Sequence, residues 1–518
     1  MQKLPIGIQT FRDIIENNLL YVDKTKEINE LINSGKYFFI SRPRRFGKSL
    51  LLSTIKEIFN GNKELFRGLY IENKYTWEKH PVIHISMSNL KGTNDINSIN
   101  QSTLLMLNNS AKENDIVLEK FDNPAMMFGE LIIKLSKINK VVILIDEYDK
   151  PILDNINNLD IAKQNRVFLR DFYSVLKDND QYIKFCLLIG ISKFSKVSVF
   201  SGLNNLKDIT LSEKFSTICG LTQKEVDAYF DDRIPWISEK LKLTKEELKE
   251  KIRLWYNGYS WDGVNKVYNP FSILNFFEDG QFNNYWFSTG TPTFLIEKFK
   301  ESKTIIEDVS EFETGGLFFD SFDIETIDFR ALLFQTGYLT IKNFDEVSNI
   351  YTIGYPNKEV KDAFLAYITT TFTEKSAGDI DYISKALRIS LMKEDYSKFF
   401  MLLKSLFISI PYQIHIPAEA YYHSLFYLIM ELVGINFLAE RSTSKGRIDG
   451  VVEFDDKIYI IEFKYLPEDK EVEKVLESAI EQIKEKEYYL PYIKKNKVIK
   501  DLAVAINREL VEYNLLEN

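Results

Sequence analysis

The stretch ISRPRRFGKSL at residues 40–50 decides how the first half of the chain is interpreted. It follows a short apolar run and leads into a helical pattern, and a loop between a strand and a helix N-terminus is suited to bind phosphate. Gly47 would let the backbone approach a phosphate, Lys48 would reach the β and γ phosphates, and Ser49 would bind Mg²⁺. The stretch therefore predicts an α/β domain with a nucleotide site.

The match to a phosphate loop is imperfect. Arg42 stands where the first glycine of such a loop usually falls, and Pro43 and Arg44 follow it. A bare Gly-Lys-Ser also occurs by chance, so a basic turn before a helix is the alternative interpretation. The residues that we expect to bind the cofactors ATP and Mg²⁺ here are Arg45, Phe46, Gly47, Lys48, Ser49 and Leu50.

A second motif, VVILIDEYD at 141–149, supports the phosphate loop. It is an apolar strand that ends in Asp146 and Glu147, and ligands of open α/β sheets bind at the carboxyl ends of the strands. Asp146 would hold Mg²⁺ through water, and Glu147 would polarise the attacking water. A strand followed by an acidic turn is the alternative, and the Gly-Lys-Ser upstream makes it the weaker one.

Other polar residues could complete this site. The apolar run FCLLIGIS at 185–192 ends near Ser192 and Lys193, either of which could sense the γ-phosphate. The helical stretch RVFLRDFYSVLK carries Arg166 and Arg170, and either could act as an arginine finger. A simple strand end and two ordinary surface arginines are the alternatives.

Length and charge bound the class of protein. With 518 residues the chain exceeds the roughly 250–300 residues at which a single core stops growing, so two or more domains are expected. The net charge of −9 does not favour nonspecific nucleic-acid binding, which would need a local basic patch. Two such patches exist: Arg42, Arg44, Arg45 and Lys48 near the start, and Lys494, Lys495, Lys497 and Lys500 near the end. For the second patch, a solvated charge run is the alternative.

Cysteine usage and hydropathy favour a cytoplasmic protein. Cys186 and Cys219 are too few for a disulfide framework and suit a reducing compartment. With four histidines besides, a structural zinc site is not expected. The N-terminus has no signal pattern, and no apolar run approaches the ~18–20 residues of a membrane span. We therefore expect a soluble, cytoplasmic protein with no membrane partner.

The first two segments of the chain differ in their pattern of apolar and polar residues. Residues 1–220 alternate short apolar runs with helical patterns, which indicates a buried parallel sheet. Its expected strands are Tyr37–Ile40, Val82–Ser86, Val141–Ile145 and Phe185–Ile189. Residues 221–300 form a mostly helical lid, where Thr222 and Glu225 have the spacing of a capping box.

The remaining residues form two further segments. Residues 301–400 are expected to be a connector that includes the strand-like piece GYLTIKNF. Residues 401–518 return to an α/β pattern. The elements expected there are a helix at Tyr422–Val433, strands at 447–454, 457–465 and 501–506, and a charged helix at 470–490.

The sequence GRIDGVVEFDDKIYIIEFKY at 446–465 predicts a hairpin with a defined register. Two alternating apolar strands flank Asp455-Asp456, which we interpret as a two-residue turn. Phe454 then pairs with Lys457, and the two residue numbers of every further cross-strand pair have the same sum as 454 and 457. This register sets Asp449 opposite Glu462, and Lys464 lies on the same face because it is two residues further on.

Such a face suits phosphodiester hydrolysis. Two opposed carboxylates repel each other unless a cation bridges them, and Mg²⁺ takes oxygen ligands of this kind. Lys464 could orient a water or stabilise charge on a phosphate. The alternative is a salt-bridged polar face in which Lys464 or Arg447 neutralises the acids. Weaker supporting candidates are Glu431, Glu440, Gln482 and Tyr488.

The combination of motifs resembles known families. The N-terminal part resembles the bacterial AAA-ATPase-like family in LPIG (4–7), YVDKT (21–25), RPRRFGKS (42–49), LIDEYDKP (144–151), FSGLNNLKDIT (200–210), WYNGY (255–259) and YNPFSIL (268–274). The C-terminal part resembles the PD-(D/E)XK nuclease-like domain often fused to it, in YHSLF (422–426), GRID (446–449) and IEFK (461–464).

The resemblance implies both a fold and site residues. It implies an ASCE-type, AAA-like P-loop sheet domain, a helical lid and connector, and a C-terminal α/β domain like that of restriction endonucleases. By resemblance, Lys48 and Ser49 bind nucleotide, while Asp146 and Glu147 bind Mg²⁺ and catalyse. The implied nuclease set is Asp449, Glu462 and Lys464, and the implied metal ligands are Ser49, Asp146, Asp449 and Glu462.

Two functions follow as expectations. The first is an ATP-binding and ATP-hydrolysing protein coupled to a metal-dependent nuclease that acts on DNA, with mobile-element or phage defence as its setting and RNA as another substrate. The second is a nucleotide-switched module that binds nucleic acid or protein without cleavage. The third hypothesis is a purely structural protein whose two sites have lost their activity. An oligomer is compatible with the sequence but not required by it.

Overall fold

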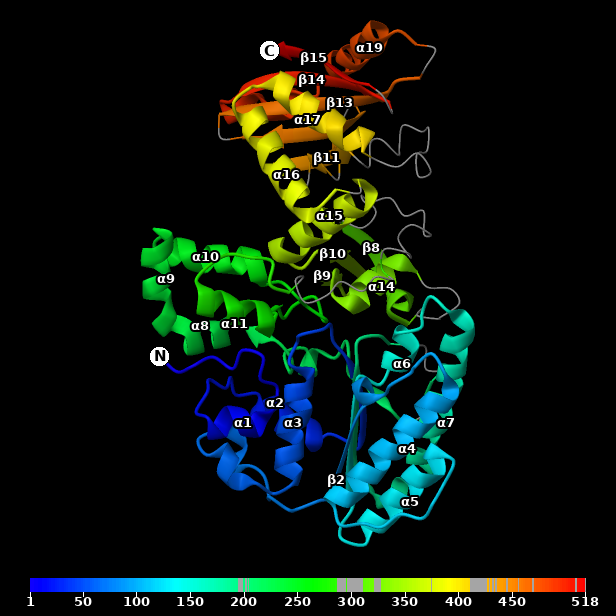
Figure 1. Ribbon diagram of the computed structural model, residues 1–518. Helices are drawn as coiled ribbons and strands as arrows, with labels where there is room; N and C mark the ends of the chain where they lie inside the picture. The colour runs from blue at the N-terminus through cyan, green and yellow to red at the C-terminus, as the bar shows by residue number, and fades with distance from the viewer. Residues whose placement is uncertain are drawn as a thin grey trace. The chain divides into compact units, whose positions relative to one another are not determined.

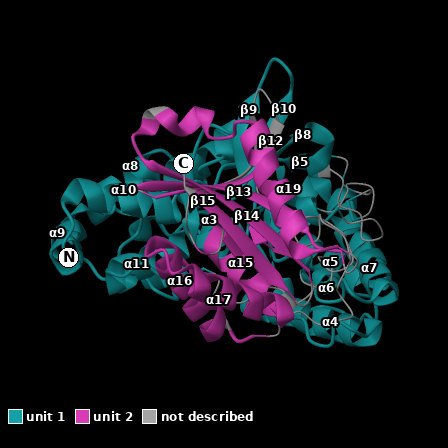
Figure 2. Ribbon diagram, turned by 90° about the horizontal axis from the view of Figure 1, so that it is seen from above, with its two compact units in different colours: residues 1–302, 311–360 teal, residues 303–310, 361–518 magenta. Residues whose placement is uncertain are grey.

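The computed structural model describes most of the chain (Figure 1). The described residues are 1–193, 199–200, 203, 205–286, 295, 311–320, 328–373, 375–409, 426–427, 429–430, 433, 436–443, 446–454, 456–467, 470–507 and 510–517. The chain divides into two compact units, Met1–Ser302 with Glu311–Val360 and Lys303–Ser310 with Lys361–Asn518 (Figure 2). The expected domain boundaries at residues 220, 300 and 400 stay predictions.

A five-stranded parallel sheet forms the centre of the first unit. Its strands are β1 (Tyr37–Ser41), β2 (Val82–Ser86), β3 (Val141–Asp146), β4 (Ile183–Gly190) and β5 (Lys207–Asp208). They lie in the order β2-β3-β4-β1-β5, so β4 separates the strand before the phosphate loop from the strand that ends in Asp146. The four expected strands and their parallel arrangement are confirmed.

Helices cover both faces of this sheet. Helix α3 (Lys48–Phe59) packs on β2 and β3 with α1 (Phe11–Glu16) beside it, and Figure 1 shows α4, α5 and α7 grouped on the other side. The remaining bounds in this part are α2 (Thr25–Ile32), α4 (Ile96–Glu113), α5 (Pro124–Ser136), α6 (Lys150–Leu153) and α7 (Leu159–Asp178). Both faces are covered, and β1 and β3 accordingly consist of buried residues throughout.

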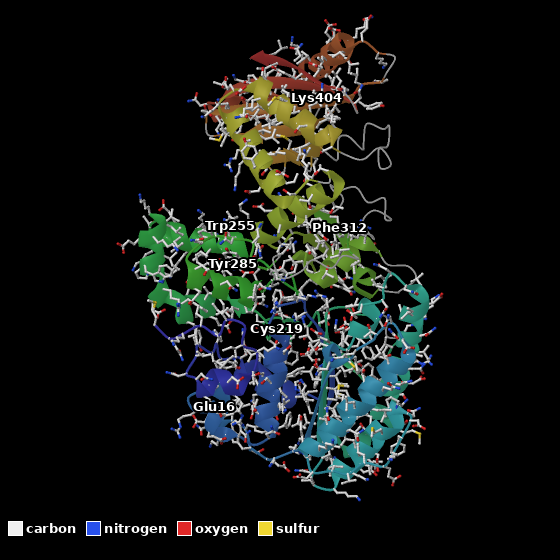
Figure 3. All side chains as sticks on the ribbon, viewed as in Figure 1. Glu16, Cys219, Trp255, Tyr285, Phe312 and Lys404 are labelled. Atoms are coloured by element: carbon white, nitrogen blue, oxygen red, sulfur yellow. The ribbon has the colours of Figure 1, made fainter. Side chains whose placement is uncertain are left out.

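A helical group follows the sheet, as expected for 221–300. Its helices are α8 (Gln223–Phe230), α9 (Ile234–Leu241), α10 (Lys245–Tyr256) and α11 (Pro270–Asp279). The predicted capping box is confirmed, because Thr222 and Glu225 satisfy each other's backbone N–H groups. Aromatic rings fill the group, and Tyr256 contacts Tyr285, which Figure 3 labels together with Trp255.

Small antiparallel sheets complete the first unit. The strands β8 (Glu311–Gly315), β10 (Ile350–Gly354) and β9 (Thr340–Asp345) form one sheet, and α14 (Phe329–Thr336) precedes β9. The strand-like piece GYLTIKNF is confirmed in part, because β9 begins at its fourth residue, Thr340. A two-stranded pair joins β6 (Leu221–Thr222) to β7 (Val267–Tyr268).

The second unit contains a mixed five-stranded sheet. Its strands, in spatial order, are β11 (Asn436–Thr443), β12 (Gly446–Glu453), β13 (Lys457–Tyr465), β14 (Val498–Ile506) and β15 (Val511–Glu517). Its helices are α15 (Lys358–Thr373, which begins in the first unit), α16 (Ala377–Met392), α17 (Tyr396–Ile408) and α19 (Val472–Glu485). Apolar residues of α19 pack against β13 and β14.

Two strands of this sheet were not expected. The predicted final strand at 501–506 is not the last, because β15 pairs antiparallel with β14, and β11 pairs with β12 on the other side of the hairpin. The residues of β11 mix polar and apolar types without strict alternation, which gives no strand signal, whereas residues 511–515 of β15 do alternate and could have indicated a strand. Most of the expected helix Tyr422–Val433 lies outside the described residues.

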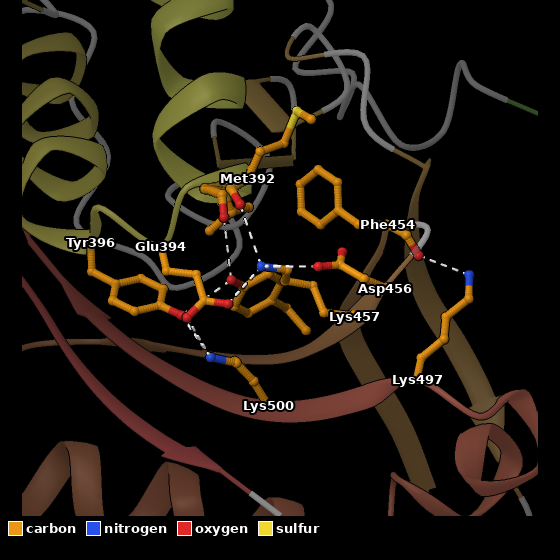
Figure 4. Close-up of polar contacts among 10 residues, drawn as sticks. Met392, Glu394, Tyr396, Phe454, Asp456, Lys457, Lys497 and Lys500 are labelled. Atoms are coloured by element: carbon orange, nitrogen blue, oxygen red, sulfur yellow. Dashed lines mark hydrogen bonds and ion pairs between the residues drawn. The ribbon is translucent and has the colours of Figure 1, made fainter.

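The basic run near the C-terminus is partly buried. Lys500 is only 4% exposed and donates to Glu394, which also accepts from Lys457 (Figure 4). Lys495 and Lys497 both pair with Glu453. A solvated charge run is therefore the wrong interpretation for Lys500, and the Lys494 side chain lies outside the described residues.

The described helices were compared with the requirements of a membrane-spanning helix. None of them combines the length and the apolar character that a membrane-crossing helix requires.

Candidate functional site

The phosphate loop joins β1 to α3 through two left-handed residues. Gly47 has φ 80° and Arg45 has φ 67°. The left-handed conformation suits glycine and is uncommon for arginine. Helix α3 begins at Lys48, so its first free N–H groups face the loop as the sequence predicted.

Lys48 lies in the middle of its own loop. Its Nζ donates to the carbonyl oxygens of Arg42 at 2.9 Å and Pro43 at 2.7 Å. The side chain is buried, and desolvation lowers its pKa, while Asp146 and Asp149 oppose that change. An ammonium held on two carbonyls, without a carboxylate at ion-pair distance in the described part of the chain, is suited to meet an anion.

Ser49 and Asp146 come together across the sheet. The Ser49 hydroxyl donates to Asp146 Oδ2 at 2.6 Å, although the two residues are 97 positions apart. Asp146 is the last residue of β3 and is buried. A hydroxyl and a carboxylate at this distance present the oxygen ligands that Mg²⁺ accepts, so the two residues fit the predicted metal.

Glu147 follows directly in a strained backbone conformation. Its φ is 51°, in the left-handed region that an ordinary residue seldom adopts. Burial and the neighbouring carboxylate of Asp146 raise the pKa of Glu147, and Lys48 opposes that shift. A carboxylate with a raised pKa is a better proton acceptor, which suits the predicted role of Glu147 as the base.

The orientation of the Arg42 side chain explains why the first position of the loop does not need a glycine. The side chain is fully buried and turned into the protein, with Nη1 donating to the carbonyls of Ser41 at 2.8 Å and Thr210 at 2.9 Å. The guanidinium also lies 4.0 Å from the ring centroid of Trp261. Burial lowers the pKa of Arg42 to about 10. Arg42 thus supports the loop from behind and leaves the phosphate side open.

Aromatic residues from the helical group also contact the loop. Phe46 packs edge-on against Tyr259 and Trp261, with centroids 4.7 Å and 5.3 Å away. Trp286 donates its indole N–H to the carbonyl of Arg44 at 3.2 Å. We call Tyr259, Trp261, Phe271 and Trp286 the aromatic clasp. Sequence reasoning missed it as part of the site, although WYNGY and YNPFSIL were noticed as motifs.

A cleft of about 500 Å³ opens over the loop. It is lined by five of the expected cofactor-binding residues, Arg45, Gly47, Lys48, Ser49 and Leu50, and by Glu147. The side chain of Phe46 is buried against the clasp instead, so only its backbone can contribute to the cleft. Lining residues that the sequence did not predict include Pro5, Ile8, Gln9, Phe271 and Leu274.

The expected γ-phosphate sensors have other partners. The Ser192 hydroxyl and N–H both donate to Asp149 Oδ2, and Asp149 also accepts from the N–H of Ile191. Lys193 pairs with Asp208 at 2.8 Å. Burial raises the pKa of Asp149, and its contacts with Ser192 lower it. Asp149, which sequence reasoning missed, therefore ties the end of β3 to the end of β4.

The arginine-finger candidates do not line the cleft. Arg170 is exposed on α7 and pairs with its neighbour Asp171 at 3.2 Å. Arg166 lies on the same helix, and neither arginine is among the residues around the cleft.

The register of the C-terminal hairpin is confirmed. Gly450 pairs with Ile461 and Glu453 with Ile458, so the printed numbers give the constant sum that the turn at 455–456 predicts. The Phe454 N–H donates to the carbonyl of Lys457 at 2.8 Å. Asp455 itself lies outside the described residues.

Asp449, Glu462 and Lys464, which we call the hairpin site, lie close together. The Asp449 carboxylate accepts from the N–H of Phe463 at 2.9 Å. Lys464 Nζ lies 2.9 Å from Oε1 of Glu462, whose side chain is fully buried. The salt-bridged alternative predicts this ion pair, and the metal-site interpretation requires that Lys464 leave Glu462 when a metal binds, so both stay hypotheses.

Tyr488 is a supporting candidate that interacts electrostatically with the residues of the hairpin site. Desolvation raises its pKa, Asp449 and Glu462 raise it further, and Gln482 lowers it by a hydrogen bond. The Glu431 and Glu440 side chains lie outside the described residues. Among the residues described, no group of three or more His, Cys, Asp and Glu side chains gathers as a metal site. Two carboxylates suit Mg²⁺, which keeps several waters and takes few protein ligands.

Comparison with known proteins matches both halves of the chain. Residues 5–200 match the family described as "Predicted AAA-ATPase", and residues 417–514 match the PD-(D/E)XK nuclease superfamily. A protein of Azotobacter chroococcum mcd 1, called "Uncharacterized protein in vnfD 5'region", is 38% identical over 521 residues, covering 98% of this chain and 97% of that one. No solved structure matches. The chain therefore belongs to the AAA-ATPase-like family and carries a C-terminal domain of the PD-(D/E)XK nuclease superfamily.

Proposed function

We propose that the chain binds and hydrolyses ATP at the phosphate loop and cleaves DNA at the hairpin site with a divalent metal. The observation that carries the first activity is the 2.6 Å contact between the Ser49 hydroxyl and the Asp146 carboxylate beside Lys48. Residues from two distant motifs meet there at the carboxyl end of a parallel sheet, where ligands of such sheets bind.

Each residue of the phosphate-loop site has a distinct task. Ser49 and Asp146 would hold Mg²⁺, which supplies charge neutralisation to the phosphates when bound. Lys48 would exchange its two loop carbonyls for phosphate oxygens. Glu147 would take a proton from the water that attacks the γ-phosphorus, and the raised pKa suits it to that task.

The hairpin site would act on a phosphodiester. Asp449 and Glu462 would hold the metal, which lowers the pKa of a bound water. Lys464 would leave Glu462 Oε1 and donate to a phosphate oxygen, stabilising the charge that develops there. DNA is the substrate we propose, RNA is its alternative, and a role in mobile-element or phage defence stays a prediction.

A cleavage screen over metals, nucleotides, DNA and RNA tests this function. The wild type is compared with Lys48→Ala and with Glu462→Ala. We expect Mg²⁺-dependent cleavage that Glu462→Ala abolishes, and ATP hydrolysis that Lys48→Ala abolishes while Glu462→Ala leaves it intact. An absence of cleavage under every condition, with Asp449→Ala indistinguishable from wild type, would refute the nuclease assignment.

A second candidate function is a nucleotide-switched module that binds nucleic acid or a protein without cutting. The Lys464–Glu462 ion pair favours it, because a neutralised face needs no metal. ATP binding would then switch the binding of the partner. Binding without cleavage that survives Lys464→Ala favours this second function. Loss of cleavage in Lys464→Ala, with binding retained, favours the nuclease.

A further inference from the structure

The cleft over the phosphate loop holds more positive charge than Lys48 alone. Arg44, Arg45 and Lys150 also line it. Lys150 forms an ion pair with Asp154 at 2.8 Å, which compensates its charge locally. Arg44 and Arg45 belong to the loop itself and are both exposed toward solvent. A polyanion in the cleft would therefore meet two arginines supplied by its own loop.

Arg45 is the arginine whose position is fixed. Its guanidinium carbon lies 4.9 Å from the ring centroid of Phe271, which lines the same cleft at the start of α11. Stacking on a ring restricts the long side chain and occupies only the face of the guanidinium, so its N–H groups can still donate at the edges. For Arg44 no ring contact or ion pair of the guanidinium is found among the described residues.

The left-handed backbone contributes to the same arrangement. Arg45 has φ 67°, and a non-glycine residue in that region is uncommon and often marks a functional site. Here the left-handed backbone of Arg45 accompanies the stacking of its guanidinium on Phe271, a residue of the cleft wall. The arginines of α7 offer no alternative, since they do not line the cleft.

We propose that Arg45 supplies, within its own chain, the guanidinium that stabilises the γ-phosphate during ATP hydrolysis, and that Phe271 is its positioning residue. This assignment rests on the proposed ATPase function. Water attacks the γ-phosphorus and gives its proton to Glu147, the bond to the β–γ bridging oxygen breaks, and ADP leaves with the electron pair. Arg45 donates to the oxygens whose negative charge rises in this step.

One consequence separates this assignment from a finger contributed by a neighbouring copy. A site complete within one chain turns over ATP at a rate per chain that does not change with protein concentration. A finger from a second copy makes that rate rise as the copies associate. Dilution of the wild type therefore gives a first test, and we expect a constant turnover per chain.

The decisive experiment compares four variants. Arg45→Asn keeps a residue that tolerates a left-handed backbone, Arg45→Lys keeps the charge, Phe271→Leu removes the ring, and Arg170→Ala is the matched arginine control outside the cleft. The measurements are kcat, ATP affinity by calorimetry, and retention of ADP with aluminium fluoride, a mimic of the transferred phosphoryl group.

We expect Arg45→Asn to lower kcat about 100- to 1000-fold with ATP affinity changed less than about tenfold, and to lose retention of the aluminium fluoride complex. Added guanidinium restores part of kcat, Arg45→Lys and Phe271→Leu show intermediate loss, and Arg170→Ala matches wild type. Unchanged kcat in Arg45→Asn, or a large loss in Arg170→Ala, overturns the assignment. Failure of the proposed ATPase itself differs, because the wild type then neither binds nor hydrolyses ATP.

Discussion

The phosphate-loop site and the hairpin site use the same residue types in opposite ways. Both bring a lysine next to two acids. Lys48 donates to backbone carbonyls of its own loop, whereas Lys464 forms an ion pair with the buried Glu462. The charge of the loop lysine is therefore available to an anion, whereas the charge of the hairpin lysine is balanced by Glu462. Residue type alone does not show which state a site is in.

The two sites also differ in how far apart in the sequence the residues that position them lie. The hairpin site arises from two neighbouring strands and one turn. The loop site depends on Asp146, on Thr210 behind Arg42, and on the aromatic clasp. A change far from the loop in sequence should therefore affect the loop site, while the hairpin site should respond to local changes.

The largest effect is expected for Glu147→Gln. An amide cannot accept the proton of the attacking water, so hydrolysis should fall about 100- to 10,000-fold while ATP binding is retained. Because burial and Asp146 raise the Glu147 pKa, wild-type hydrolysis should be lost as pH falls through a value above the ordinary 4.5 of a glutamate. A steady-state pH profile measures this, and a midpoint at or below the ordinary value would contradict the role.

Arg42 tests the support behind the loop. Arg42→Lys keeps a buried charge but loses the planar contacts to the carbonyls of Ser41 and Thr210 and to Trp261, and we expect destabilisation of roughly 3–5 kcal/mol. Arg42→Met removes the charge as well, so its loss should be smaller. Chemical denaturation measures both. A conservative lysine that is tolerated better than methionine would show that Arg42 does not act as described.

Glu359 supports the clasp and should make it sensitive to pH. Its Oε1 accepts from the N–H of Trp286, and burial raises its pKa from 4.5 to about 7. The folded state then keeps a proton that the unfolded state releases, so stability falls as pH rises from about 4.5 to about 7, by about 3 kcal/mol in total. Glu359→Gln mimics the protonated form.

The measurement for Glu359 is a pair of thermal melts at pH 5 and pH 8. We expect the difference between the two midpoints to shrink in Glu359→Gln because the variant gains stability at pH 8 only. An equal pH dependence in wild type and variant would show that Glu359 ionises normally in the folded state.

The smallest effect is expected at the hairpin site. Lys464→Met removes the ammonium beside Glu462, and because Lys464 is about a quarter exposed the loss should be only about 1–2 kcal/mol in metal-free buffer. Mg²⁺ should then stabilise the variant more than it stabilises the wild type, since the metal takes over the charge of the lysine. Thermal melts with and without Mg²⁺ measure the difference, and an equal response of both proteins would count against a metal there.

Sequence reasoning predicted the local features of both sites. The hairpin register followed from a two-residue turn and strict alternation, and the meeting of Ser49 with Asp146 followed from two strand ends of one parallel sheet. In both cases the geometry is set by residues near the motif or by a general rule of sheet topology.

The contacts that the sequence could not show come from remote segments. Nothing around Arg42 indicates that Trp261 lies over it, and the serine after β4 gives no sign that its hydroxyl is bonded to Asp149. The Arg42 contact depends on how the helical group packs on the sheet, and the Asp149 contact depends on how the loops after β3 and β4 meet; both are tertiary properties. The strand β11 was missed for a related reason, since pairing with β12 stabilises it more than its own pattern does.

The most direct test is a calorimetric titration of ATP with Mg²⁺ into wild type, Lys48→Ala and Glu462→Gln. We expect a single ATP site per chain that Lys48→Ala weakens at least about 100-fold and Glu462→Gln leaves unchanged, because the proposed nucleotide and nuclease-metal sites are separate. Equal binding by wild type and Lys48→Ala would contradict it.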